Sequence, residues 1–308
     1  MISFLTASVI AMTPLLFATL GELLMEKSGN LNLGVEGMML MGAVIGFYAG
    51  FQTENPIMAL LAASGAGALG ALIYAILTVT LRANQVVSGL ALTIFGTGFA
   101  NFFGRLLVGK SIPRGITNFF SKKTIPLLGD IPYIGPVFFR QDLFVYLGYL
   151  LVILIGVYLY HTRKGLNLRM VGENPAAADA IGIPVNLYKY IHILFGGVLC
   201  GLGGAYLSLV YVPAWQEGIV AGRGWIAIAL VIFSQWNPYK AFLGAYLFGG
   251  LHIAGFRLQS FKLPISQYFI NLLPYIVTII VLVIGSIKEN KKNNAPEGLT
   301  IPYFREDR

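Results

Sequence analysis

Several uninterrupted apolar stretches, each about as long as a bilayer is thick, leave few folds open to this sequence. A helix needs about 20 mostly apolar residues to cross the hydrocarbon core, because it rises only 1.5 Å per residue. Such runs recur along most of the chain, and only 11% of its 308 residues are charged, against roughly 25% in a typical soluble domain. The chain is therefore predicted to be an all-α polytopic membrane protein.

The expected spans cover most of the sequence. They lie at roughly 2–24, 34–51, 56–81, 85–108, 142–161, 188–212, 224–236, 241–257 and 268–287. The 224–236 run is too short to cross a bilayer alone, so we expect eight to ten transmembrane helices. These bounds define a transmembrane domain over 1–287, and a basic tail over 288–308 that is expected to be cytoplasmic and flexible.

Lys and Arg residues set the expected orientation, because cytoplasmic loops carry an excess of them. Alternation of nine spans puts the 162–187 loop, the tail and most Lys and Arg residues inside, and the N-terminus outside. Residues 1–3 carry no basic segment, so the first apolar run is interpreted as a retained span rather than a cleaved signal. The net charge of +8 is attributed to contacts with anionic lipid, not to nucleic-acid binding.

A short helix of the soluble type is expected inside the 162–187 loop, within "GENPAAADAIGIPV" (172–185). Asn174 is a preferred N-cap, Pro175 suits the first helical position, and Gly182 falls where a left-handed residue ends a helix. A capped helix on the membrane surface is a rigid feature that another protein can grip. The alternative is a docked surface helix without a partner.

Glu36 lies in "NLNLGVEGMMLMG" (30–42), beside or inside a span. A carboxylate at this depth is costly and usually faces a partner, a cavity or a path. Two interpretations follow. The segment is either a broken helix that lines a substrate route, with Asn30 and Asn32 at its mouth, or a structural break whose glutamate is tied to backbone N–H groups.

A weak internal repeat relates two parts of the chain. "EG" at 36–37 and "NP" at 55–56 recur as "EG" at 217–218 and "NP" at 237–238, with offsets of 181 and 182. The matching spans run in opposite directions in the expected topology, as in the inverted repeats of many transporters. Chance similarity between Gly/Ala-rich apolar segments is the alternative.

Sequence signals for an enzyme are weak. "GRLLVGKS" (104–111) matches the pattern of a phosphate-binding loop, but that motif needs a strand and a helix of a soluble α/β domain around it. His161, His192, His252 and Cys200 are scattered without catalytic or metal-ligand spacing. We therefore expect a protein that is not an enzyme and that holds no metal or cofactor of its own.

Four segments resemble a known family of transporters. "RKGLNLRMVGENPAAADAIGI" (163–183) is similar to the coupling loop of ABC-importer permeases in the branched-chain amino acid/simple sugar permease superfamily. "SGNLNLGVEGMMLMGA" (28–43) is similar to the N-terminal signature of that superfamily. Together with 125–139 and 215–238, it resembles the nucleoside-type subgroup. The resemblance runs collinearly from about residue 15 to 287.

The resemblance implies the channel-forming subunit of an importer in a bacterial cell membrane. Its partners would be a second permease subunit, often a related chain in a heterodimer, two ABC ATPase subunits that bind ATP and Mg, and an extracytoplasmic substrate-binding lipoprotein. The short helix would contact the ATPase, and hydrolysis would belong to those partners. The implied coupling residues are Glu173, Asn174, Pro175, Ala176, Ala177, Ala178, Asp179, Ala180 and Gly182.

The implied substrate is a nucleoside, which has an aromatic base and a polar sugar. A path for it needs aromatic faces and a few amide or carboxylate groups. The candidates are Asn32, Glu36, Phe102, Phe103, Trp215 and Glu217, and packing or interface anchoring is the alternative for each. A ribose- or galactose-like sugar, a branched-chain amino acid, or an ion-coupled secondary transporter without an ATPase are the competing functions. Only Glu36 and Arg105 are charged residues that we place well inside a span.

Overall fold

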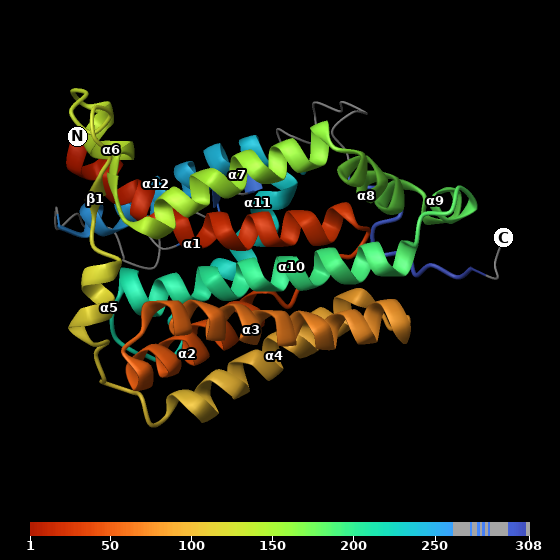
Figure 1. Cartoon of the computed structure of the whole chain (residues 1–308), viewed down its shortest axis with the longest axis horizontal. Coiled ribbons are helices and arrows are strands. Elements are labelled where there is room, and N and C mark those ends of the chain that lie inside the picture. Colours follow the sequence, from red (N-terminus) through yellow and green to blue (C-terminus); the bar gives the residue numbers. More distant parts are fainter. Residues whose placement is uncertain (261–271, 273–275, 278, 281–282, 284–294, 306–308) are drawn as a thin grey trace.

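A computed structural model describes residues 1–260, 272, 276–277, 279–280, 283 and 295–305, and it is almost entirely helical (Figure 1). The helices are α1 (Ile2–Lys27), α2 (Val35–Thr53), α3 (Pro56–Ala75), α4 (Gln85–Gly104), α5 (Arg114–Phe119), α6 (Ile134–Phe138), α7 (Leu143–His161), α8 (Arg163–Glu173), α9 (Pro175–Ala180), α10 (Val185–Tyr206), α11 (Arg223–Phe233) and α12 (Pro238–Ser260). The π-helical turns η1 (Ile76–Thr80) and η2 (Leu207–Tyr211) extend α3 and α10.

Within the described residues, seven helices are long and apolar enough to cross a membrane: α1, α2, α3 with η1, α4, α7, α10 with η2, and α12. The expected class of an all-α, multi-pass membrane protein is thus confirmed. The short α11, with 11 residues, confirms that the 224–236 run does not span alone. The expected span at 268–287 lies almost wholly outside the described residues.

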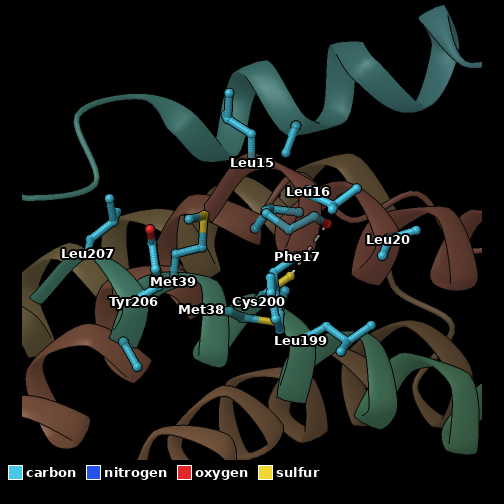
Figure 2. Packing of buried hydrophobic residues seen from close by; sticks show 14 of the residues in the cluster. Leu15, Leu16, Phe17, Leu20, Met38, Met39, Leu199, Cys200, Tyr206 and Leu207 are labelled. Carbon is cyan, nitrogen blue, oxygen red and sulfur yellow. Dashed lines mark hydrogen bonds between the residues drawn. The ribbon is translucent and has the colours of Figure 1, made fainter. Parts of the chain in front are cut away.

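Helices α1 and α10 form the centre of the bundle, side by side in Figure 1. Figure 2 shows Leu16 and Phe17 of α1 close to Leu199 and Cys200 of α10, all of them buried. Glycines let the backbones of α2, α3 and α10 touch, since a Cβ on Gly42 would lie 2.3 Å from the Cα of Gly201. Small residues at such contacts are how helices pack tightly in lipid.

The two ends of the bundle are built differently (Figure 1). One end carries the N-terminus, α5, α6 and a two-stranded hairpin of β1 (Lys123–Thr124) and β2 (Arg140–Gln141), which pair antiparallel. The other end carries α8, α9 and the described part of the C-terminal tail. The sequence predicted one short helix between the flanking spans here, whereas the structure has two, and α10 begins at Val185 rather than at 188.

The repeated "NP" motifs have the same structural role. The Asn55 side chain accepts a hydrogen bond from the Ile57 N–H (2.9 Å) at the start of α3, and Asn237 accepts one from the Tyr239 N–H (2.9 Å) at the start of α12. In both helices proline follows the cap, where its missing N–H costs nothing. The repeat therefore places two equivalent helix starts, although α11 is shorter than α2, its counterpart in the repeat.

The two equivalent helices begin at opposite ends of the bundle. α3 begins beside α5, and a Cβ on Gly115 of α5 would lie 3.9 Å from the Glu54 carbonyl oxygen. α12 begins beside the carboxyl end of α1, where the Trp236 indole donates to the Glu26 carboxylate (2.5 Å). Opposite directions are the relation that an inverted repeat requires.

Candidate functional site

The short helix expected in the 162–187 loop is α9. The Asn174 side chain accepts a hydrogen bond from the Ala177 N–H (2.9 Å), and Pro175 occupies the first turn. Gly182 has a φ of +86°, a left-handed conformation that a residue with a Cβ adopts only at a cost. Both ends of α9 therefore have the local chemistry that its sequence predicts.

One face of α9 is buried and the other is open. Ala178 is fully buried in a small cluster with Val171, Ile183 and Val185, so it fixes the helix in place and offers no contact surface. The remaining predicted coupling residues are exposed or half-buried; they are Glu173, Asn174, Pro175, Ala176, Ala177, Asp179, Ala180 and Gly182. Ile181, which sequence reasoning missed, is 65% exposed beside them, and an apolar side chain off the packed face was the available signal.

Helix α8 anchors α9 to the first span. Its start is capped by the Thr162 hydroxyl, which accepts from the Gly165 N–H (3.0 Å). Near its other end, a Cβ on Gly172 would lie only 2.3 Å from the Lys27 carbonyl oxygen at the end of α1. Because the two backbones touch here, α8 and α1 are packed without a side chain between them.

The described part of the tail, residues 295–305, packs on α8 and α9. The Gly298 N–H donates to the Gly172 carbonyl (2.9 Å), and the Tyr303 hydroxyl donates to the Asp179 carboxylate (2.7 Å). Arg305 forms an ion pair with the same carboxylate (3.2 Å). Both an aromatic and a basic residue of the tail therefore contact the same carboxylate of α9.

Glu36 joins two distant parts of the chain. Its carboxylate accepts hydrogen bonds from the N–H groups of Gly222 (2.8 Å) and Gly224 (2.7 Å), in the first turn of α11. A helix N-terminus is a favourable place for an anion, because its first N–H groups lack partners within the helix. Both carboxylate oxygens are occupied, so this geometry favours the structural alternative stated above, in which backbone N–H groups hold the glutamate.

This junction lies inside the bundle rather than at its surface. A Cβ on Gly96, in the middle of α4, would lie 2.4 Å from the Cα of Gly37, so α2 begins well away from the end of α4. The N-termini of α2 and α11 therefore meet at Glu36, deep between the spans. Interrupted helices that meet in this way are typical of transporters with inverted repeats.

The loop before α2 is held by buried side chains. Gln85 accepts from the Leu31 N–H (2.8 Å), and the Tyr74 hydroxyl donates to the Leu31 carbonyl (2.6 Å). Asn32 is fully buried, and its side chain accepts from the Gly34 N–H (2.7 Å). The geometry thus gives Asn32 a local turn-forming role.

The other path candidates do not gather at one place. Trp215 is 2% exposed and packs against Phe47 with ring centroids 6.1 Å apart. Glu217 is exposed in the loop before α11. Phe102 and Phe103 lie on the open side of α4, 76% and 46% exposed, and they contact each other edge to face.

Two exposed polar side chains of α4 were missed by sequence reasoning. Thr97 and Asn101 are both exposed, one helical turn apart. The Thr97 hydroxyl donates to the Thr93 carbonyl (2.9 Å), whereas the Asn101 amide makes no side-chain hydrogen bond among the described residues. Lipid cannot satisfy such an amide, so this face suits a protein partner or a wet path better than hydrocarbon.

A family model for the branched-chain amino acid transport system, permease component, matches residues 4–282. The chain belongs to this permease family. The match to this family begins two residues inside α1 and extends over all the other described spans. It includes the Glu36 junction and the segment from α8 to α9. Among solved structures, none is a significant match.

Three curated relatives cover nearly the same length as this permease. A provisionally named glucose ABC transporter permease of Haloferax volcanii is 38% identical, over 98% of this chain and 97% of its own. The guanosine ABC transporter permease of Bacillus subtilis is 36% identical, over 97% of this chain and 95% of its own. The nucleoside ABC transporter permease of Lactococcus lactis is 36% identical, over 88% of each.

The permease carries more charge inside its spans than the sequence interpretation allowed. Glu22 and Glu26 are both buried in α1, which runs three residues past the expected end of the first span. Glu22 accepts from the Asn32 N–H (2.8 Å), and Glu26 accepts from Trp236. Each carboxylate holds a loop against α1: Glu22 holds the loop before α2, and Glu26 holds the loop before α12.

Proposed function

We propose that this permease is the channel-forming subunit of an ABC importer for nucleosides, and that α9 is its contact with the partner ATPases. The observation that carries the proposal is the division of α9 into a fixed face and an open face. Ala178 and Asp179 hold the helix against α8 and the tail, while Ala176, Ala177 and Ile181 remain exposed. A helix of this kind is suited to dock in a groove of another protein.

The mechanism depends on the rigidity of α9. When ATP closes the partner ATPases, they would displace α9, and a flexible loop would absorb that displacement. Three features keep α9 rigid, so that it would not absorb the displacement: the Asn174 cap, the buried Ala178 and the contacts with the tail. ATP and Mg would bind to the partner subunits, and this chain would convert their movement into opening of the path.

The path is proposed to form between this permease and a second, related permease subunit. The open face of α4 supports this arrangement, because Thr97, Asn101 and Phe102 are exposed there. A neutral solute with an aromatic base can stack on phenylalanine rings and bond to an amide. A substrate-binding lipoprotein outside the membrane would deliver the solute, so α4 would need to bind it only weakly.

Nucleosides are the preferred substrate class because the Bacillus and Lactococcus relatives, both named for nucleoside compounds, match over most of the chain. Glucose is the second candidate, since the Haloferax relative is 38% identical. The test is uptake of radiolabelled guanosine into proteoliposomes that contain the whole importer and ATP. Uptake of radiolabelled glucose by the same proteoliposomes, with no uptake of guanosine, adenosine or uridine, would exclude the nucleoside assignment.

The ATPase contact is tested by variants of the open face of α9. Ile181→Arg should prevent co-purification of the ATPase, while the amount and melting temperature of the permease stay unchanged. Leu187→Arg is the matched control, because Leu187 is exposed at the same end but lies on α10. Normal ATPase binding and uptake by the Ile181→Arg importer would remove α9 from the contact. Uptake without any ATPase would favour a secondary transporter instead.

A further inference from the structure

An apolar groove between α7 and α10 has no part in the transport mechanism described above. It encloses about 530 Å³, with Leu24 of α1 at its base. Its walls come from the carboxyl-terminal half of α7 and the amino-terminal half of α10, on the side of the bundle that carries α8. Leu154, Leu187 and Ile191 are each more than half exposed at this groove.

The polar groups in the wall of the groove are already satisfied. The Tyr158 hydroxyl is 2.8 Å from His192 Nε2, and His192 Nδ1 is 2.6 Å from the Tyr188 carbonyl oxygen. The Asn167 amide in turn donates to the Tyr188 hydroxyl (3.0 Å). Because these groups bond to each other, the body of the groove offers an apolar surface and little to a polar solute.

A cationic rim closes one end of the groove. Lys164 of α8 lines it, and Arg163 precedes Lys164 in the first turn of the same helix. That turn contains no acidic residue, although the positive end of a helix dipole favours an anion. Among the described residues, neither cation forms an ion pair, so no acidic side chain in that part of the chain balances the positive charge at this rim.

We propose that this groove binds a phospholipid with an anionic head group. An acyl chain would lie along the apolar walls, and the head-group phosphate would bind between Lys164 and the first turn of α8. Charge favours this occupant over a helix of a second permease, since such a helix would have to bury Lys164 and Arg163 or supply acids for them. The site depends on the membrane location of the chain and not on the identity of the transported solute.

The experiment measures lipid binding to the full-length permease, purified in detergent, by native mass spectrometry. The probes are dioleoyl phosphatidylglycerol, dioleoyl phosphatidylcholine and inorganic phosphate. The unmodified permease should retain phosphatidylglycerol best, and inorganic phosphate should not compete with it. Lys164→Ala should weaken phosphatidylglycerol binding about fivefold and leave phosphatidylcholine unaffected, because one basic residue near a membrane contributes that much.

Two further variants separate the groove from the surrounding lipid surface. Leu154→Trp should narrow the groove and weaken binding of both lipids, whereas Leu150→Trp, on the exposed side of α7 outside the groove, should bind like the unmodified protein. An unchanged lipid preference in Lys164→Ala would overturn the proposal. So would a Leu154→Cys thiol that reagents reach in the isolated permease but not in the assembled importer, since a subunit would then cover the groove.

Discussion

Two short helices, α9 and α11, interrupt the series of spans, and their first turns are satisfied in opposite ways. The first turn of α9 is capped by Asn174, its immediate neighbour in the sequence. The first turn of α11 is capped by Glu36, from a helix that lies 186 residues earlier in the chain. A local cap makes a helix that depends little on the rest of the fold, whereas a remote cap makes the helix part of the packing.

This difference predicts that the two caps have unequal effects on stability. Glu36→Ala should have the largest effect, because it leaves the N–H groups of Gly222 and the buried Gly224, at the start of α11, without acceptors. Each hydrogen bond to a charged group contributes about 1.5–3 kcal/mol, so the permease should lose much of its folded population. The measurement is the yield of monodisperse protein together with its melting temperature in detergent.

Glu217→Ala is the matched control for this experiment, since Glu217 is the repeat counterpart of Glu36 and is exposed. It should leave the melting temperature unchanged. Glu36→Gln keeps one acceptor oxygen and should fall between the two. Equal stability of the Glu36→Ala and Glu217→Ala proteins would contradict the proposed role of the cap.

Gly224→Ala should have the next largest effect, because its Cβ would lie 2.5 Å from the Glu36 backbone nitrogen and Cα. Forcing a methyl group into a packed contact typically costs about 1–3 kcal/mol. Gly98→Ala is a suitable control, since a Cβ at Gly98 has no heavy atom within 4 Å. A lower melting temperature is expected for Gly224→Ala only. A decrease of the melting temperature in both variants would mean that alanine is poorly tolerated at either glycine.

Asn174→Ala should have a smaller and local effect. Loss of an N-cap costs about 1 kcal/mol, and here the cost falls on α9 rather than on the bundle. Hydrogen exchange of the α9 amides should become faster while the melting temperature stays within error, and Asn174→Asp should restore the slow exchange. Faster exchange across α1 and α10 as well would show that α9 is not an independent unit.

Tyr303→Phe should have the smallest effect of the series. It removes the hydroxyl that donates to Asp179 and keeps the ring, and one such hydrogen bond contributes about 1 kcal/mol. Exchange of the amides at 176–180 should increase slightly, with no change in α11. Ser234→Ala, at the end of α11, serves as a control that changes a local hydrogen bond elsewhere.

The same contrast between local and remote contacts explains what the sequence could predict. Apolar length predicted most of the spans, and Asn174 predicted a helix start, because a cap acts on its own neighbours. Glu36 was recognised as a residue in need of a partner, but nothing near it in the sequence points to Gly222 or Gly224. Its two alternatives could be weighed only once α2 and α11 were placed together.

Other parts of the site could not be predicted from the sequence either, because they depend on contacts between residues that are far apart in the chain. The burial of Ala178 depends on Val171 and Val185 folding over it, and the contact of Tyr303 with Asp179 joins residues 124 positions apart. The open face of α4 is visible only when the neighbours of every helix are known. In the sequence, Thr97 and Asn101 are two polar residues in an apolar run, and packing against another helix would have been an equally good account of them.

The close contact between Gly172 and the end of α1 has a mechanical consequence. A displacement of α9 would reach the last turn of α1 through touching backbones, and the next residues of the chain lead to Glu36 and the start of α11. Packed backbone and one short loop would then join α9 to the Glu36 junction at the centre of the bundle.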